Sequence, residues 1–482
     1  MAGNGSKVNK EIPNVMEYVS QLDTDAQNWS QNLVERFITS LSKLTVARKP
    51  SFLVAEQILS QLITPDLKEF DLSLIVNLYP EEPQFAFAIK ALQLVSSKAK
   101  ICKLKIKILE SAGAINYIIP QMNVEMRAGI RGLESLRHLD VDRFYFTIDD
   151  LIKLCREISS LRDLIVKIAA QPIQIFGDPD LLESFKNSFG KLAVFRFSSL
   201  SEEDHSKEFE EELTCLCVRH LPNLQFVGNF SLFADMTRPC MEQKDQSKLQ
   251  HLSLRLKRSE AQVVASFDKF PDVHTLSLKW DSDYNYCPVE GSKIKALLEF
   301  SRLNTLKLVN ITSPPYFKQF LKIYGKQLKE LDLCYKYEIE AMDLEFKLIC
   351  EFCPELETID LRGIRDITDS DWSMASFSEL KELNLIFTRD TTHLIQLSDL
   401  LSAPNLREMT LVNIRVSEDE LKKTLEMTEA GEISSKIDYL KFFVLAEENV
   451  DDSLENAMNN NWDKLVNVLK KTRPDANINI IW

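Results

Sequence analysis

The chain has 482 residues and a formal net charge of −14 at pH 7, with 45% hydrophobic and 27% charged residues. This length exceeds the roughly 250–300 residues that a single hydrophobic core can serve, so we expect several domains or an array of repeats. The acidic balance disfavours nucleic acid and anionic membranes as partners, and only 12 glycines leave few candidates for phosphate-binding loops.

The first 13 residues contain no apolar core like that of a signal peptide, and no segment of the chain approaches the ~18 apolar residues of a membrane span. The nine cysteines are odd in number and irregularly spaced, which is typical of reduced thiols. The sequence therefore predicts a protein of the cytoplasm or the nucleus, with a flexible segment at 1–13.

Two segments with helical spacing of apolar residues follow, at 28–44 and 51–63, and Pro50 separates them. We expect residues 14–64 to form a helical N-terminal cap. Residues 65–135 are a transitional region in which two degenerate repeats, LKEFDL from Leu67 and ICKLKI from Ile101, are open alternatives to irregular structure.

A motif of the form apolar-x-x-apolar-x-apolar recurs through residues 136–450. Each copy favours a short strand, and helical spacing follows it, with helix-start signals at Thr147, Thr368 and Ser417. The copies lie about 27 residues apart on average, within the range of roughly 20–29 that is typical of leucine-rich repeats. They begin at Leu136, Leu161, Leu192, Leu224, Leu249, Val273, Leu303, Leu328, Leu356, Leu380, Leu406 and Ile437.

The predicted fold is therefore α/β, a leucine-rich-repeat solenoid or horseshoe with one inner parallel sheet and outer helices. Residues 451–482 should cap its C-terminal end, because WDKLVNVLKK has helical spacing and ANINIIW alternates like an edge strand.

Residues 349–372, ICEFCPELETIDLRGIRDITDSDW, resemble the cysteine-containing subtype of leucine-rich repeat. That subtype is typical of F-box/leucine-rich-repeat proteins, which are substrate receptors of cullin ubiquitin ligases. The segment 50–67 is similar to the first half of an F-box, through Pro50, Glu56, Ile58, Leu59, Leu62, Asp66 and Leu67, but the second half is absent.

The resemblance implies that Pro50, Ile58, Leu59 and Leu62 bind a cullin adaptor. A structural cap is the alternative, and burial of Leu59 and Leu62 against the first repeat would prevent adaptor docking.

Catalytic chemistry has no supporting motif in this sequence. The chain lacks a Walker loop, a dinucleotide fingerprint and a nucleophile elbow. The potential metal ligands near Cys215 and Cys350 lie about 130 residues apart, several repeats along a solenoid in which only neighbours touch. We therefore predict no enzyme activity and no catalytic, cofactor-binding or metal-binding residues.

The side chains between the apolar positions of each repeat should point off the concave face of the sheet. In chain order, the first of these side chains are basic and the later ones are acidic. This pattern predicts a protein ligand with an acidic end and a basic end. Solvated charge without a partner is the alternative. The early members are Lys103, Lys105, Lys107, Arg196, His251, Arg255, Lys279 and Lys307, and the later ones are Glu330, Asp332, Asp360, Glu382 and Glu408. A cullin-ligase substrate receptor and a stand-alone scaffold or inhibitor are the two competing functions.

Overall fold

A computed structural model provides the coordinates of the chain. The structure describes residues 34–39, 52–78, 85–107, 119–170, 177–200, 204–228, 236, 238, 240, 245–256, 267–280, 295, 297–311, 314–335, 342–368, 372–392, 394–433, 436–445 and 452–481. The chain divides into two compact units, Met1–Ala234 and Asp235–Trp482.

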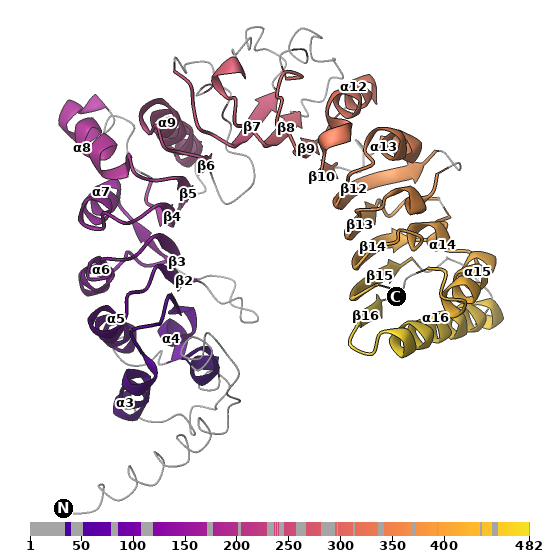
Figure 1. Cartoon of the computed structure of the whole chain (residues 1–482), viewed down its shortest axis with the longest axis horizontal. Helices are drawn as coiled ribbons and strands as arrows, with labels where there is room; N and C mark the ends of the chain where they lie inside the picture. The colour runs from indigo at the N-terminus through magenta and orange to yellow at the C-terminus, as the bar shows by residue number, and fades with distance from the viewer. Residues whose placement is uncertain are drawn as a thin grey trace, which may run out of the picture. The chain divides into compact units, whose positions relative to one another are not determined.

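The first unit contains a six-stranded sheet in which every neighbouring pair of strands is parallel and the spatial order follows the chain. Helices α5 to α8 lie along one side of strands β2 to β5 (Figure 1). The strands are β1 (Glu69–Asp71), β2 (Lys103–Ile106), β3 (His138–Phe146), β4 (Asp163–Ile168), β5 (Val194–Ser199) and β6 (Phe226–Gly228). The helices are α3 (Phe52–Leu62), α4 (Ser73–Leu78), α5 (Ala86–Lys98), α6 (Val124–Arg131), α7 (Ile148–Glu157), α8 (Pro179–Phe189) and α9 (Asp204–His220).

The second unit contains a ten-stranded sheet, again with parallel neighbours in chain order. Its strands are β7 (His251–Leu256), β8 (Thr275–Trp280), β9 (Thr305–Val309), β10 (Glu330–Cys334), β12 (Thr358–Ile367), β13 (Glu382–Phe387), β14 (Glu408–Ile414), β15 (Tyr439–Val444) and β16 (Asn477–Ile481), with β11 (Met342–Leu344) paired to the end of β12. Its helices are α12 (Pro314–Tyr324), α13 (Phe346–Phe352), α14 (Leu397–Leu400), α15 (Glu418–Glu429) and α16 (Asp452–Thr472), with short 3₁₀ turns at Phe267–Lys269, Gly325–Gln327 and Met374–Ser376.

The strands confirm the position of every predicted repeat. Each of the twelve copies from Leu136 to Ile437 is followed by a strand that begins two residues later, and the two degenerate copies at Leu67 and Ile101 are strands β1 and β2. The predicted final helix and edge strand are also present, as α16 and β16. A parallel strand at each predicted repeat position is thus present in both units.

Buried apolar ladders hold the repeats together. Leu331 and Leu333 of β10 lie opposite Ile359 and Leu361 of β12, and all four side chains are buried. One repeat alone would leave this apolar face in water, so each repeat depends on its neighbours for burial.

The prediction of one continuous sheet is wrong for the described residues, because β1–β6 and β7–β16 form two separate sheets. The copy at Leu224 has Asn229 where other copies have their third apolar residue. Its strand β6 is described as far as Gly228, where the described residues of this segment end.

Two of the three predicted helix starts are confirmed. The hydroxyl of Thr147 accepts a hydrogen bond from the Asp150 N–H at 3.2 Å, and that of Ser417 accepts one from the Glu420 N–H at 3.2 Å. The third signal, at Thr368, relied on Asp371, which lies outside the described residues. After it the structure has only the 3₁₀ turn Met374–Ser376, whose first residue follows the capping residue Ser373.

Candidate functional site: the exposed face of the ten-stranded sheet

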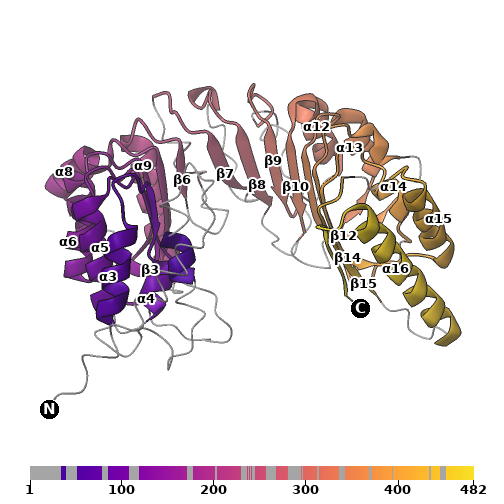
Figure 2. The same cartoon turned by 60° about the horizontal axis from the view of Figure 1, so that its bottom comes forward.

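Helices α12 to α15 lie on one side of the ten-stranded sheet, and the strands present their other side away from them (Figures 1 and 2). Side chains along a strand alternate between the two sides, so every second residue belongs to the face away from the helices. The strand register aligns these residues in three rows.

The first row consists of His251, Thr275, Thr305, Glu330, Thr358, Glu382, Glu408, Tyr439 and Asn477. The second row consists of Ser253, Ser277, Lys307, Asp332, Asp360, Asn384, Thr410, Lys441 and Asn479. The third row consists of Arg255, Lys279, Val309, Cys334, Arg362, Ile386, Val412, Phe443 and Ile481.

The three rows are accessible mainly between β10 and β16. On β7, β8 and β9 the row members Ser253, Ser277 and Val309 are buried, with 3%, 0% and 2% of their surface exposed. From β10 onward the row members are half-buried or exposed. Strands β10 to β16 therefore provide the part of this face that a ligand can contact.

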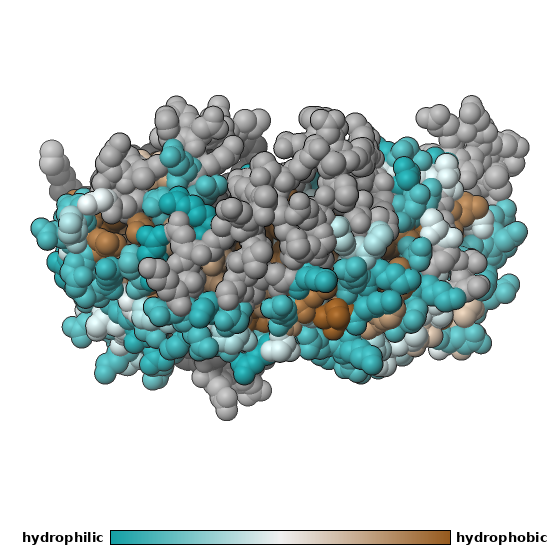
Figure 3. All heavy atoms as spheres, turned by 90° about the horizontal axis from the view of Figure 1, so that it is seen from above, coloured by the Kyte–Doolittle hydropathy of each residue, from teal (hydrophilic) through white to brown (hydrophobic). Residues whose placement is uncertain are grey.

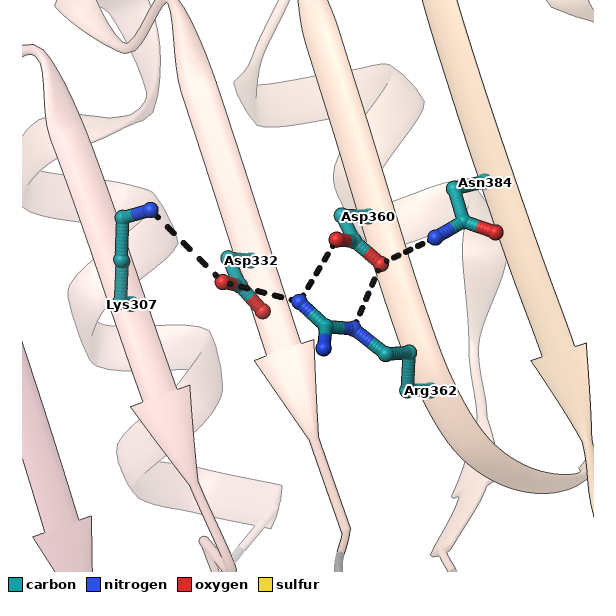
Figure 4. Close-up of polar contacts among 5 residues, drawn as sticks. All are labelled: Lys307, Asp332, Asp360, Arg362 and Asn384. Atoms are coloured by element: carbon teal, nitrogen blue, oxygen red, sulfur yellow. Dashed lines mark hydrogen bonds and ion pairs between the residues drawn. The ribbon is translucent and has the colours of Figure 1, made fainter. Parts of the chain in front are cut away.

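A network of five polar side chains occupies the β9–β13 part of this face, and all five project from the same side of the sheet (Figure 4). Arg362 donates to both carboxylate oxygens of Asp360, at 2.9 and 2.7 Å, and its Nη2 lies 3.5 Å from Asp332 Oδ2. Lys307 Nζ lies 3.8 Å from the same oxygen of Asp332, and Asn384 donates to Asp360 Oδ1 at 2.9 Å. Two cations thus pair with two carboxylates across the three strands β9, β10 and β12, and Asn384 extends the network to β13.

Burial dominates the electrostatics of Asp332, whose side chain is 15% exposed. Burial raises the pKa of Asp332, and the nearby charge of Asp360 raises it further, whereas Arg362 and Lys307 lower it; the net direction is upward. Burial alone would lower the pKa of Arg362, but the hydrogen bond to Asp360 and the two carboxylate charges outweigh burial and raise it. The positive charge of Arg362 therefore stabilises both carboxylates on this face.

The acidic stretch predicted from the sequence divides into two kinds of residue. Asp332 and Asp360 both form ion pairs with Arg362 in the network. Glu330, Glu382 and Glu408 are exposed and make no ion pair with any described residue. These three glutamates carry the negative potential of the face.

The basic members on the ten-stranded sheet also lie on the predicted face. His251, Arg255 and Lys279 are half-buried on β7 and β8, and Lys307 belongs to the network. Their part in partner binding stays a prediction.

On the six-stranded sheet, three of the predicted basic residues have partners within the chain. Lys103 pairs with Glu69 of the neighbouring strand at 3.2 Å, and Lys107 pairs with Asp140 at 2.7 Å. Arg196 lies over an aromatic ring of β6, with its guanidinium carbon 4.3 Å from the ring centroid. The register thus places carboxylates beside two of the predicted lysines, and the part of these residues in partner binding stays a prediction.

Three of the four residues predicted to bind a cullin adaptor are buried. Ile58, Leu59 and Leu62 are 2%, 0% and 8% exposed, and α3 packs against α5, where Lys98 Nζ donates to the Ser60 carbonyl at 2.5 Å. These three side chains belong to the core and offer no surface to an adaptor in this structure, which corrects that prediction. Pro50 lies outside the described residues.

Among the residues that the structure describes, no group of three or more His, Cys, Asp or Glu side chains is arranged to hold a metal ion. Cys215, Cys217 and Cys353 are buried, and burial raises the pKa of the Cys353 thiol to about 12, which keeps it protonated. Among the described helices, none is long and apolar enough to cross a membrane.

The described residues on the face shown in Figure 3 are mostly hydrophilic, with small hydrophobic patches. No known protein family matches the sequence, and no curated protein matches it. Among solved structures, the chain is similar to an internalin from Listeria monocytogenes, with 14% sequence identity and a TM-score of 0.35. The match covers 86% of this chain and 97% of the internalin chain.

Proposed function

We propose that this chain is a non-enzymatic protein-binding repeat protein of the cytoplasm or nucleus, a stand-alone scaffold or inhibitor. It holds its partner on strands β10 to β16 of the ten-stranded sheet, within a solenoid of stacked repeats that residues 14–64 cap. The observation that carries this proposal is the face itself: three registered rows of half-buried and exposed side chains, on the side of the strands opposite the helices.

The chemistry of this face supports a protein rather than a small molecule as the ligand. Small-molecule sites are concave and enclose most of the ligand, whereas the rows run across consecutive strands. The Arg362 network fixes polar side chains in one arrangement, so less side-chain entropy is lost when a partner docks. A broad, preorganised surface with polar and apolar parts is typical of protein–protein recognition.

The test uses Thr410→Arg, which places a long side chain in the middle row of the face, at a half-buried position of β14. The matched control is Glu426→Arg on the exposed side of α15, which adds the same side chain away from the sheet. Partners identified by affinity purification and mass spectrometry with the wild-type chain should be lost with Thr410→Arg and kept with Glu426→Arg. Equal retention by both variants would contradict the proposal, provided that both melt like the wild type.

A substrate receptor of a cullin ubiquitin ligase is the second candidate, and it needs an adaptor surface other than the buried residues of α3. Leu53, on the same helix, is 68% exposed, which favours a contact at that position. If Leu53 docks an adaptor, Leu53→Lys should remove a cullin and its adaptor from the purified complex and leave the other partners. Absence of a cullin from the wild-type sample would eliminate this candidate.

A further inference from the structure

The third row becomes apolar after Arg362. Ile386, Val412, Phe443 and Ile481 follow one another on the adjacent strands β13, β14, β15 and β16, each the direct partner of the next. The first three are half-buried, and Ile481 is 40% exposed. These four residues, the apolar strip, form a continuous line of partly exposed hydrocarbon across one end of the sheet.

The first row on the same strands carries an unbalanced pair of charges. Glu382 and Glu408 are direct partners on β13 and β14, both are exposed, and neither makes an ion pair within the described chain. Like charges directly opposite each other on neighbouring strands repel and destabilise the pair. A positively charged group of a binding partner would therefore be stabilised beside Glu382 and Glu408.

The dimensions of this surface fit a helix. Neighbouring strands lie about 4.8 Å apart, close to the ~5.4 Å rise of one α-helical turn, so a helix that crosses the strands can place one side chain on each strand. Four residues along a strand separate the first row from the third, which is about 13 Å. A lysine or arginine on the flank of a helix of ~10–12 Å diameter can span that distance.

We propose that strands β13 to β16 bind an amphipathic helix of a partner protein. The helix lays an apolar stripe along the apolar strip and directs basic side chains to Glu382 and Glu408. This inference rests on the proposed function and specifies the partner's chemistry. The acid pair disfavours anionic lipid and nucleic acid as occupants, because both would add negative charge beside two unbalanced carboxylates.

The position of Lys441 indicates at which end of the partner helix the basic residues lie. Lys441 lies in the middle row on β15 and sits over the ring of Phe443, 4.8 Å from the centroid. Positive charge is thus favoured over β13 and β14, whereas β15 already carries a cation. The basic residues of the partner helix should therefore lie at its end over β13 and β14.

The experiment measures binding to the full-length chain by fluorescence anisotropy with three labelled peptides of about 15 residues, enough for four helical turns. The first has leucines at helical spacing and lysines on one flank at one end. The second has glutamates in place of the lysines, and the third has serines in place of the leucines. The first peptide should bind more tightly than either of the other two, and its affinity should fall as salt is raised.

Reversal of the acid pair is the decisive variant. Glu382→Lys combined with Glu408→Lys should weaken binding of the lysine peptide roughly tenfold and reverse the preference toward the glutamate peptide. Glu426→Lys on α15 is the matched control and should change neither affinity. Ile481→Ser, at the exposed edge of the sheet, should weaken both peptides alike without affecting the preference.

Equal affinity for the lysine and glutamate peptides, or an unchanged preference after reversal of the acid pair, would overturn the inference. The proposed function is judged separately by Thr410→Arg and the partners that the chain binds in cells. Loss of those partners together with an absent peptide preference would remove the basic helix as ligand while the sheet face stays the binding surface. Retention of those partners by Thr410→Arg would count against the proposed function itself.

Discussion

Arg362 is the residue whose removal most directly probes the polar face. Its guanidinium reaches Asp360 at 2.7 Å and Asp332 at 3.5 Å, and the two carboxyl side chains are only 24% and 15% exposed. Arg362→Met keeps a long hydrocarbon side chain but leaves both carboxylates without their shared cation. The variant should therefore be destabilised by unbalanced charge, with little change in packing.

The expected loss in the free energy of unfolding lies between two limits. Removing one partner of a fully buried ion pair costs about 3–5 kcal/mol, because the other charge is left uncompensated, whereas exposed pairs contribute about 0–1 kcal/mol. Arg362 is 37% exposed and the two carboxyls are less so, which places the loss at about 2 kcal/mol. In a unit of 248 residues, Asp235–Trp482, this corresponds to a fall in Tm of roughly 4–8 °C.

The loss of stability in Arg362→Met should depend on pH. Arg362 lowers the pKa of Asp332, so its removal raises that pKa further above the ordinary value. A carboxyl whose folded pKa is raised contributes stability that is present at low pH and is lost as pH rises through the folded pKa. The deficit of Arg362→Met should therefore be smaller at pH 5 than at pH 7.

Thermal unfolding followed by circular dichroism at both pH values is the assay, with the double variant Arg362→Met and Asp332→Asn as the control. The second substitution removes one of the two unbalanced charges, so it should restore part of the stability at pH 7. An Arg362→Met variant as stable as the wild type at pH 7, or one with the same deficit at both pH values, would refute the reasoning.

Three further predictions concern the repeat stack. Leu361→Asp places a charge at a position that is 0% exposed and should cost several kcal/mol, seen as loss of the cooperative unfolding transition of the second unit; wild-type melting would contradict the repeat register. Gly363 has φ of +73°, and an added Cβ would lie 2.3 Å from the Tyr335 carbonyl oxygen, so Gly363→Ala should cost about 2 kcal/mol or more in urea unfolding; an unchanged midpoint would contradict that crowding. The buried hydroxyl of Tyr324 donates to the Leu297 carbonyl at 2.6 Å, so Tyr324→Phe should cost about 1–3 kcal/mol in the same measurement, and no loss would mean that this bond contributes nothing.

The repeat positions could be predicted from the sequence because the signal is periodic and local. An apolar residue at the first position, as at Leu356, precedes the start of the strand by two residues, and the alternation of apolar and polar residues determines which side each residue faces. Even the degenerate copies at Leu67 and Ile101 followed this rule. Local capping chemistry at Thr147 and Ser417 was predictable for the same reason.

The partners of charged side chains could not be predicted in the same way, because they depend on the register between strands far apart in sequence. Asp332 and Arg362 are 30 residues apart, yet they meet on neighbouring strands. Arg362 lies two residues after Asp360 on the same face, and this spacing was the one signal in the sequence that could have identified the network. The charge of each residue could be predicted from the sequence, but the ion pairs of Lys103, Lys107 and Asp332 could not.

The burial of Ile58, Leu59 and Leu62 shows a second limit. An amphipathic helix presents the same apolar pattern whether its stripe docks a partner or packs inside its own chain. Packing against neighbouring elements such as α5 decides between the two, and the pattern of α3 contains no information about it.

The most direct test of the account is a contact map between the chain and its cellular partner. A photo-crosslinking amino acid is introduced singly at Thr410 on the sheet face and at Glu426 on α15, and the crosslinked products are identified by mass spectrometry. We expect the partner to be captured from Thr410 and not from Glu426. Capture from Glu426 alone would place the partner on the helical side and contradict the central claim.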